Sequence, residues 1–165
     1  QKGVLFSGTI ASNLRFGKDD ATDEQIREAA EIAQASDFIA EKKEGYDSAI
    51  AQGGSNVSGG QKQRLAIARA IAKQPQVFIF DDSFSALDYQ TDAALRQALA
   101  KQTHDATVII VAQRLSTILH ADQILVLDGG RIVGRGTHSA LLRSCETYRE
   151  IALSQLSAAE LGEEG

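Results

Sequence analysis

Two adjacent carboxylates, Asp81 and Asp82, are the residues of this sequence best suited to metal-assisted chemistry. They follow residues 77–80, a run of β-branched and aromatic side chains that predicts a parallel strand covered on both faces. In open parallel sheets, ligands bind just beyond the carboxyl ends of the strands. One carboxylate could therefore bind a metal ion while the other activates a water molecule. Taken alone, the pair could also be a solvated strand end.

A second group of residues suited to chemistry lies earlier in the chain. Ser58 and Gln61 have the spacing of a capping box, in which a hydroxyl and an amide satisfy free N–H groups at a helix start. Gly59 and Gly60 leave the backbone between them bare. Such a terminus carries about half a positive charge and unpaired donors, so it favours an anion, above all a phosphate. Taken alone, residues 58–61 could be a flexible turn. The pattern is much more specific when the turn is followed in order by a helix, a strand and a carboxylate pair.

The helix that positions these groups is predicted to run to about Gln74, because Pro75 prevents its continuation. Helical spacing gives it one apolar face, and its basic side chains are expected to stay solvated. The apolar positions are Leu65, Ala68, Ile71 and Ala72, and the basic ones are Lys62, Arg64, Arg69 and Lys73.

The other elements follow from the same periodicities. Short helices are expected over residues 9–15, after a capping box of Thr22 and Gln25, and after Ser36 and Asp37, which could cap the third. A longer helix is predicted over residues 90–101, strands over 107–111, 124–127 and 132–133, and helices toward the end. Strand, helix and strand over residues 77–111 imply a parallel crossover.

Composition excludes several classes of protein. With 165 residues, of which 43% are hydrophobic and 24% charged, the chain is long enough for one domain with a core. Its longest apolar run, residues 108–112, is far shorter than the about 20 residues of a membrane span. The single Cys145 cannot form an internal disulfide and fits a reducing compartment. A formal net charge of −5 argues against nucleic acid as a partner.

Several of these motifs resemble those of ATP-binding-cassette (ABC) ATPases. Residues 57–61 resemble the signature motif, residues 78–82 the Walker B strand, and residues 85–88 the D-loop. Residues 1–10 are similar to the Q-loop and following helix of ABC exporters, and residues 108–118 to their switch strand and loop. The resemblance covers nearly the whole chain, up to about Ser157.

The resemblance implies an α/β fold: a P-loop NTPase-like ABC ATPase core, with a mostly parallel sheet flanked by helices, plus an all-helical signature subdomain. Residues 1–74 would hold the Q-loop, helical subdomain and signature helix, residues 75–156 the C-terminal half of the core, and residues 157–165 a tail. No Gly-x-x-x-x-Gly-Lys-[Ser/Thr] occurs, so the chain is expected to be the C-terminal part of such a domain, without the Walker A portion. The fragment alone is then expected to be inactive.

The resemblance also implies a role for each motif residue. Asp81 and Gln1 would bind Mg²⁺, and Asp82, Gln113 and Gln1 would be catalytic. The signature residues would contact ATP held by a second nucleotide-binding domain, next to the D-loop. The signature residues are Ser58, Gly59, Gly60 and Gln61, and the D-loop residues are Ser85, Ala86, Leu87 and Asp88.

Two positions depart from the family pattern. Asp82 stands where a glutamate usually polarises the attacking water, and one methylene less withdraws the carboxylate by about 1.5 Å from a hydrogen-bond distance of about 2.6–3.2 Å. Gln113 stands where a histidine usually contacts the γ-phosphate, and it cannot carry charge. Both changes fall in one site, which resembles the degenerate site of a heterodimeric exporter. The alternative is an active homodimer that tolerates both changes.

Three functions are compatible with these motifs. The first is the ATPase domain of a multidrug-type exporter, at the cytoplasmic face of the cell membrane, with transmembrane domains and a second nucleotide-binding domain as partners. Residues 47–54 resemble the segment that touches the membrane domain, although Gln52 and Gly53 replace the usual acidic residue and arginine. The second is a DNA-repair or chromosome ATPase, which usually carries a coiled coil, and no sustained heptad occurs here. The third is a module that clamps ATP without turnover.

Overall fold

The computed structural model describes residues 3–156, which form two compact units divided between Val111 and Ala112. Gln1 and the predicted tail, residues 157–165, lie outside the described residues. Within the described residues, no helix combines the length and the apolar character needed to cross a membrane.

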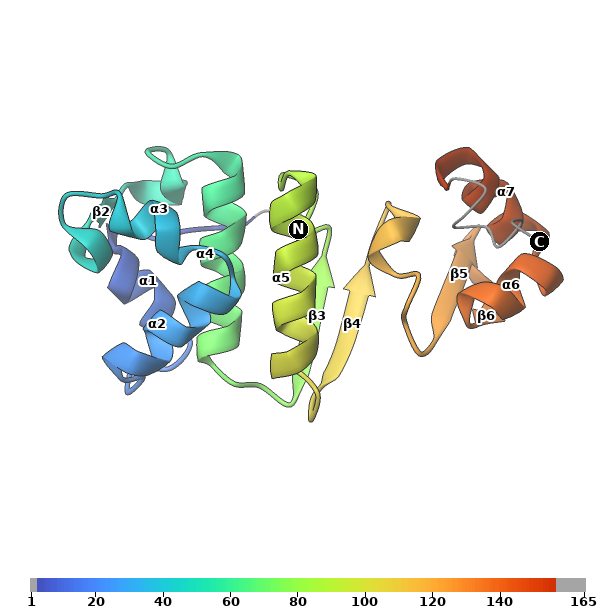
Figure 1. The fold of residues 1–165 in the computed structure, drawn as a ribbon, viewed down its shortest axis with the longest axis horizontal. Helices are drawn as coiled ribbons and strands as arrows, with labels where there is room; N and C mark the ends of the chain where they lie inside the picture. The colour runs from blue at the N-terminus through green and yellow to red at the C-terminus, as the bar shows by residue number, and fades with distance from the viewer. Residues whose placement is uncertain (1–2, 157–165) are drawn as a thin grey trace. The chain divides into compact units, whose positions relative to one another are not determined.

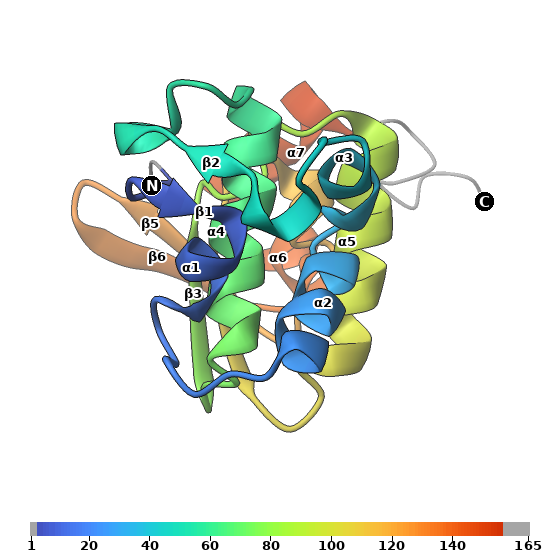
Figure 2. The same cartoon turned by 90° about the vertical axis from the view of Figure 1, so that its left-hand side faces the viewer.

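The first unit combines a helical part with a parallel strand pair (Figure 1). In the helical part, α1 and α2 both pack against α4 (Figure 2). The other part holds β3, α5 and β4, and β3 pairs in parallel with β4, Val77 lying opposite Thr107. The bounds are β1 Gly8–Thr9, α1 Ile10–Arg15, α2 Asp23–Ile32, α3 Ser36–Ala40, η1 Gly45–Asp47, β2 Ala49–Ile50, η2 Gln52–Gly54, α4 Gly59–Ala72, β3 Val77–Asp81, α5 Tyr89–Gln102 and β4 Thr107–Val111.

One hydrophobic cluster runs through the whole first unit. It joins Leu65 of α4 to Ile26 of α2, and it extends to Phe80 of β3 and Leu95 of α5. Helical spacing explains the α4 contribution, because Leu65, Ala68, Ile71 and Ala72 are all buried as predicted. The helix α4 and the strand that ends in the two carboxylates therefore share one hydrophobic cluster.

The second unit has a separate core built on an antiparallel strand pair, β5 Ile124–Asp128 and β6 Arg131–Gly136. Helices α6 His138–Ser144 and α7 Glu146–Gln155 follow, and η3 Leu115–Thr117 precedes the strands. Leu141 and Tyr148 are almost fully buried against Ile124 and Val126 of β5, as expected of the helical end of the chain. Burial raises the pKa of Tyr148, whose hydroxyl lies 2.8 Å from His138 Nδ1.

The mixed α/β class is confirmed, but β1 and β2 form an antiparallel pair within the part predicted to be all-helical, and the environment of β3 also differs from the prediction. β3 buries only one face: Phe78 and Phe80 are buried, whereas Val77 and Ile79 are 50% and 69% exposed. The prediction of a strand covered on both faces is therefore wrong within this unit. Of the three two-stranded sheets among the described residues, β3–β4 is parallel and the other two are antiparallel.

A predicted helix cap is also wrong. The N-cap of α3 is Ala35, which makes no side-chain hydrogen bond there, so neither Ser36 nor Asp37 acts as the cap. Both residues lie inside the helix instead. The capping box of α2 is confirmed, because the Thr22 hydroxyl accepts from the Gln25 N–H while the Gln25 side chain accepts from the Thr22 N–H.

Candidate functional site

The start of α4 has the geometry expected from its sequence. Ser58 is the N-cap, and its Oγ accepts a hydrogen bond from the Gln61 N–H at 3.1 Å. Gln61 Oε1 accepts from the Ser58 N–H, also at 3.1 Å. The capping box is thus confirmed. Gly59 and Gly60 form the first two helical positions, whose N–H groups have no partner within a helix.

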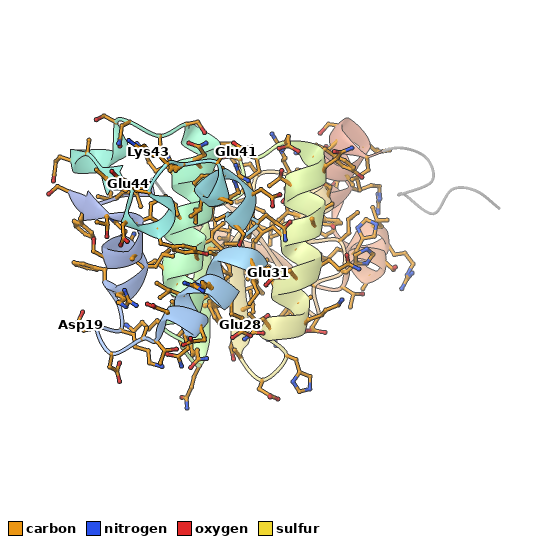
Figure 3. The ribbon with its side chains drawn as sticks, turned by 60° about the vertical axis from the view of Figure 1, so that its left-hand side comes forward. Asp19, Glu28, Glu31, Glu41, Lys43 and Glu44 are labelled. Atoms are coloured by element: carbon orange, nitrogen blue, oxygen red, sulfur yellow. The ribbon has the colours of Figure 1, made fainter. Side chains whose placement is uncertain are left out.

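Charge is distributed so that an anion is favoured at this helix start. Residues 19–44 are acidic, with nine Asp or Glu residues against three basic ones, and Asp19, Glu28, Glu31, Glu41 and Glu44 are exposed, as is Lys43 (Figure 3). From Val57 to Lys73 there are four basic residues and no acidic one. The helix dipole adds positive potential at Ser58. The helix dipole and the absence of acidic side chains from residues 57–73 therefore favour an anion at the start of α4.

Asp81 and Asp82 lie at the carboxyl end of β3, as predicted, and both are half-buried. Asp82 has a φ of 48°, in the left-handed region that aspartate tolerates better than most residues. Its N–H donates to the carbonyl of Val111 at 3.1 Å, which continues the β3–β4 pairing by one residue. The backbone at Asp82 is therefore held by the neighbouring strand.

The segment after the carboxylates turns back against the start of α4. A Cβ placed on Gly60 would lie 3.2 Å from the Ala86 carbonyl oxygen, and one on Gly59 would lie 3.8 Å from the Ala86 Cβ. Leu87 and Phe84 are buried, whereas Ser85, Ala86 and Asp88 are exposed. The backbone at Ala86 thus lies next to the start of α4, and exposed residues occur in both segments.

Asp88 ends this segment and caps the next helix. It is the N-cap of α5, and its Oδ1 and Oδ2 accept from the Thr91 N–H at 3.0 Å and the Thr91 hydroxyl at 2.7 Å. These bonds stabilise the carboxylate and lower the pKa of Asp88 below its usual value. The cap fixes where residues 85–88 end and α5 begins.

Two arginines of α4 are not solvated, which corrects the sequence prediction. Arg64 donates to the Gln34 carbonyl at 2.6 Å, with its guanidinium 4.8 Å from the ring centre of Phe38. Arg69 donates to the Val4 carbonyl at 2.8 Å and lies over the rings of Phe6 and Phe16. Burial lowers the pKa of both arginines.

These arginines tie α4 to the segment before β1 and to the end of α2, which sequence reasoning missed. Their polar positions on the helix suggest exposure, and their partners lie 30 and 65 residues away along the chain. No local signal pairs residues at such separations. The sequence does contain the aromatic side chains that these arginines cover, and arginine frequently packs on an aromatic face, but it does not show which arginine meets which ring.

The predicted site residues therefore divide into three groups. Residues 58–61, Asp81–Asp82 and residues 85–88 belong to the first unit, where the structure brings the start of α4 and residues 85–88 together. Gln113 belongs to the second unit, where it is exposed and its carbonyl accepts from Gln155 Nε2 at 3.1 Å. Gln1 lies outside the described residues.

The donor set at the end of β3 fits a magnesium ion that is completed by phosphate oxygens. The described residues contain no group of three or more His, Cys, Asp or Glu side chains able to hold a metal ion. Mg²⁺ is commonly bound by one or two carboxylates together with substrate phosphates and waters, so it does not need such a group. The sequence prediction assigns that role to Asp81, which lies at the carboxyl end of β3.

Comparison with known proteins agrees with this arrangement. The model of the ABC transporter family matches residues 1–85. An ABC transporter ATP-binding protein of Mycobacterium tuberculosis (strain ATCC 25618 / H37Rv) is 48% identical over 98% of this chain and 28% of its own length. A Staphylococcus aureus (strain NCTC 8325 / PS 47) protein named for multidrug export as an ATP-binding/permease protein is 44% identical over 92% of this chain and 26% of its own.

A solved structure is similar as well. The structure of a bacterial Atm1-family ABC exporter with ATP bound superposes with a TM-score of 0.91 at 40% identity, covering 95% of this chain and 27% of that one. The chain thus spans about a quarter of the length of these relatives. The family match over more than half of the chain, the shared α/β fold and the capped, anion-attracting start of α4 agree, and the chain belongs to the ABC transporter family.

Proposed function

We propose that this chain works within the ATPase domain of an ABC exporter, at the cytoplasmic face of the membrane, and couples ATP binding and hydrolysis to substrate export. The names of the relatives support this proposal, because one denotes a multidrug export protein and another an ABC exporter with ATP bound. The capped start of α4 supplies the signature turn, and Asp81 the carboxylate for Mg²⁺. The chain would transmit the effect of ATP binding and hydrolysis to the transmembrane domains of the exporter, which move the substrate.

Within that function, the chain completes the ATP site of a different partner subunit while its own site is impaired. Ser58 and Gly59 are exposed, so they are free to meet ATP held by a second nucleotide-binding domain. In the chain's own site, Asp82 has a shorter side chain than the glutamate that is usual at this position. The observation that carries the proposal is that the Asp82 backbone is held on both sides, because its N–H donates to the Val111 carbonyl and its own carbonyl accepts from Ser85 Oγ at 3.2 Å, so a shift that compensates for the shorter side chain would cost these hydrogen bonds.

The chemistry follows from these positions. ATP and Mg²⁺ would supply the phosphates and the charge that neutralises them. Asp81 would hold the ion, and Asp82 would polarise water poorly because its carboxylate lies about 1.5 Å short of the required distance. Gln113 would offer a neutral hydrogen bond to the γ-phosphate. Such a site would retain ATP and cleave it slowly.

Restoring both residues is expected to raise turnover at this chain's own site. Asp82→Glu returns the reach to water, and Gln113→His returns a phosphate contact that can carry charge. A positioned general base contributes about 10²–10⁴-fold, but the surrounding shell is not fitted to the new side chains, so we expect a gain of about tenfold. The measurement is ATP hydrolysis by the full transporter, in a background where the partner lacks its catalytic glutamate.

Three outcomes would contradict the proposal. In the same background, wild-type hydrolysis that survives but disappears with Asp82→Ala would make Asp82 a competent base. A transporter that purifies as a fully active dimer of identical subunits would remove the distinction between the two sites. Hydrolysis absent from every variant, with ATP binding retained, would favour an ATP-clamping module.

Gly60→Ala is expected to lower the ATPase rate of the full transporter about tenfold with little loss of stability. The new Cβ would lie 3.2 Å from the Ala86 carbonyl, so the backbone of residues 85–88 must move by a few tenths of an ångström. Alanine is a better helix former than glycine, which offsets part of the strain. Gly17→Ala is the matched control, because its nearest neighbour is the flexible Lys73 side chain at 3.4 Å. Equal rates for the two variants would contradict the prediction.

A further inference from the structure

Gln63 of α4 makes three side-chain contacts with the segment that follows the catalytic carboxylates. Its Oε1 accepts a hydrogen bond from the Ala86 N–H at 3.0 Å. Its Nε2 lies 3.3 Å from Ser85 Oγ and 3.4 Å from the Asp82 carbonyl oxygen, as a donor to both. A single half-buried amide therefore reaches the D-loop and the peptide of Asp82 together.

Together with two other hydrogen bonds, these contacts hold the backbone of Asp82 on both sides, and we call this set the Asp82 frame. The N–H of Asp82 is held by Val111, and its carbonyl accepts from Ser85 Oγ as well as from Gln63. Aspartate tolerates a φ of 48° better than most residues, but this conformation still costs free energy that the surrounding contacts must offset. Gln63 is the part of that frame contributed by the signature helix.

Gln63 also lies on the face of α4 that the D-loop covers. It is three residues beyond Gly60, so the two share one side of the helix. Gly60 allows the Ala86 carbonyl to approach, and Gln63 binds the Ala86 N–H. Ala86 thus packs against α4 at Gly60 and is hydrogen-bonded to α4 one turn later, at Gln63. The start of α4 and residues 82–86 consequently form one block.

We propose that Gln63 is a positioning residue for ATP hydrolysis: it sets the D-loop at a fixed distance from the signature turn, so that both reach the shared ATP together. This inference rests on the proposed function. Only an amide has the required combination, since its oxygen serves the Ala86 N–H while its nitrogen serves two oxygens. Glutamate has the same size but offers no donor at neutral pH, and methionine offers neither group of this strength.

The test is the steady-state kinetics of the full transporter with its partner subunit. Gln63→Met is expected to lower kcat for ATP hydrolysis about tenfold, because three hydrogen bonds are lost. Gln63→Glu keeps the acceptor for the Ala86 N–H, so a smaller loss is expected. KM for ATP should stay within about threefold in both, since Gln63 lies behind the turn rather than on its surface. Gln97→Met on the exposed part of α5 is the matched control and should leave kcat unchanged.

A double variant tests whether Gln63 and Ser85 act on kcat through the same carbonyl. Because Gln63 and Ser85 hold the same carbonyl, Gln63→Met with Ser85→Ala should be less damaging than the product of the two single effects. A lower thermal midpoint with unchanged kcat, or a raised KM with unchanged kcat, would overturn the positioning role. An inactive wild type would reject the proposed function, whereas an active wild type with unchanged kcat in Gln63→Met would reject this inference alone.

Discussion

Ser58→Arg is expected to lower ATP hydrolysis by the full transporter by two to three decades. Ser58 is exposed at the start of α4, where the turn would meet phosphate across the interface with the partner. Arginine fills that turn and removes the Oγ that caps the helix. Loss of one contact of this kind to a transition state commonly costs about 2.7–4 kcal/mol. The rate is measured in membranes or detergent with the wild-type partner.

The control for this prediction is Ser55→Arg, which adds the same side chain at another exposed position three residues earlier. It should keep the wild-type rate. Ser58→Ala distinguishes the loss of the helix cap from the effect of the large arginine side chain. Loss of an N-cap alone costs about 1 kcal/mol of stability. If Ser58→Arg leaves wild-type hydrolysis intact, this signature turn does not serve the working site.

Leu65→Ala is expected to destabilise the first unit by about 2–5 kcal/mol, the usual range for a buried leucine reduced to alanine. Leu65 is 0% exposed and belongs to the cluster that joins α4 to the rest of that unit. At about 2–4 °C per kcal/mol for a domain of this size, the corresponding transition should shift down by about 4–20 °C. Scanning calorimetry of the purified full transporter measures it.

Leu153→Ala provides the comparison for that shift, since Leu153 on α7 is 58% exposed. The same truncation there removes little buried surface, so its transition should move by no more than about 2 °C. Equal shifts for the two variants would mean that the cluster around Leu65 does not hold the unit together. ATP hydrolysis of Leu65→Ala below its transition should stay close to wild type, because the side chain lies away from the turn.

Much of the candidate site could be predicted from local spacing. The capping box of Ser58 and Gln61 and the apolar face of α4 depend on residues three or four apart, which a helix always brings together. The position of Asp81 and Asp82 depends on where a strand ends, and the apolar run marks that point. The family motifs then implied roles for these residues. The heterodimer and the impaired site stay proposals, because they concern a second subunit.

Only the tertiary structure decided how these local pieces are joined. The exposure of Val77 and Ile79 depends on what packs over β3, and the strand sequence is the same whether one or both faces are covered. Arg69 looks like a surface residue of α4 until the carbonyl of Val4 is placed beside it, 65 residues away. The bridge from Gln63 to Asp82, Ser85 and Ala86 likewise spans 19 to 23 residues. Helical spacing says which side of α4 Gln63 occupies, but only the fold places the D-loop there.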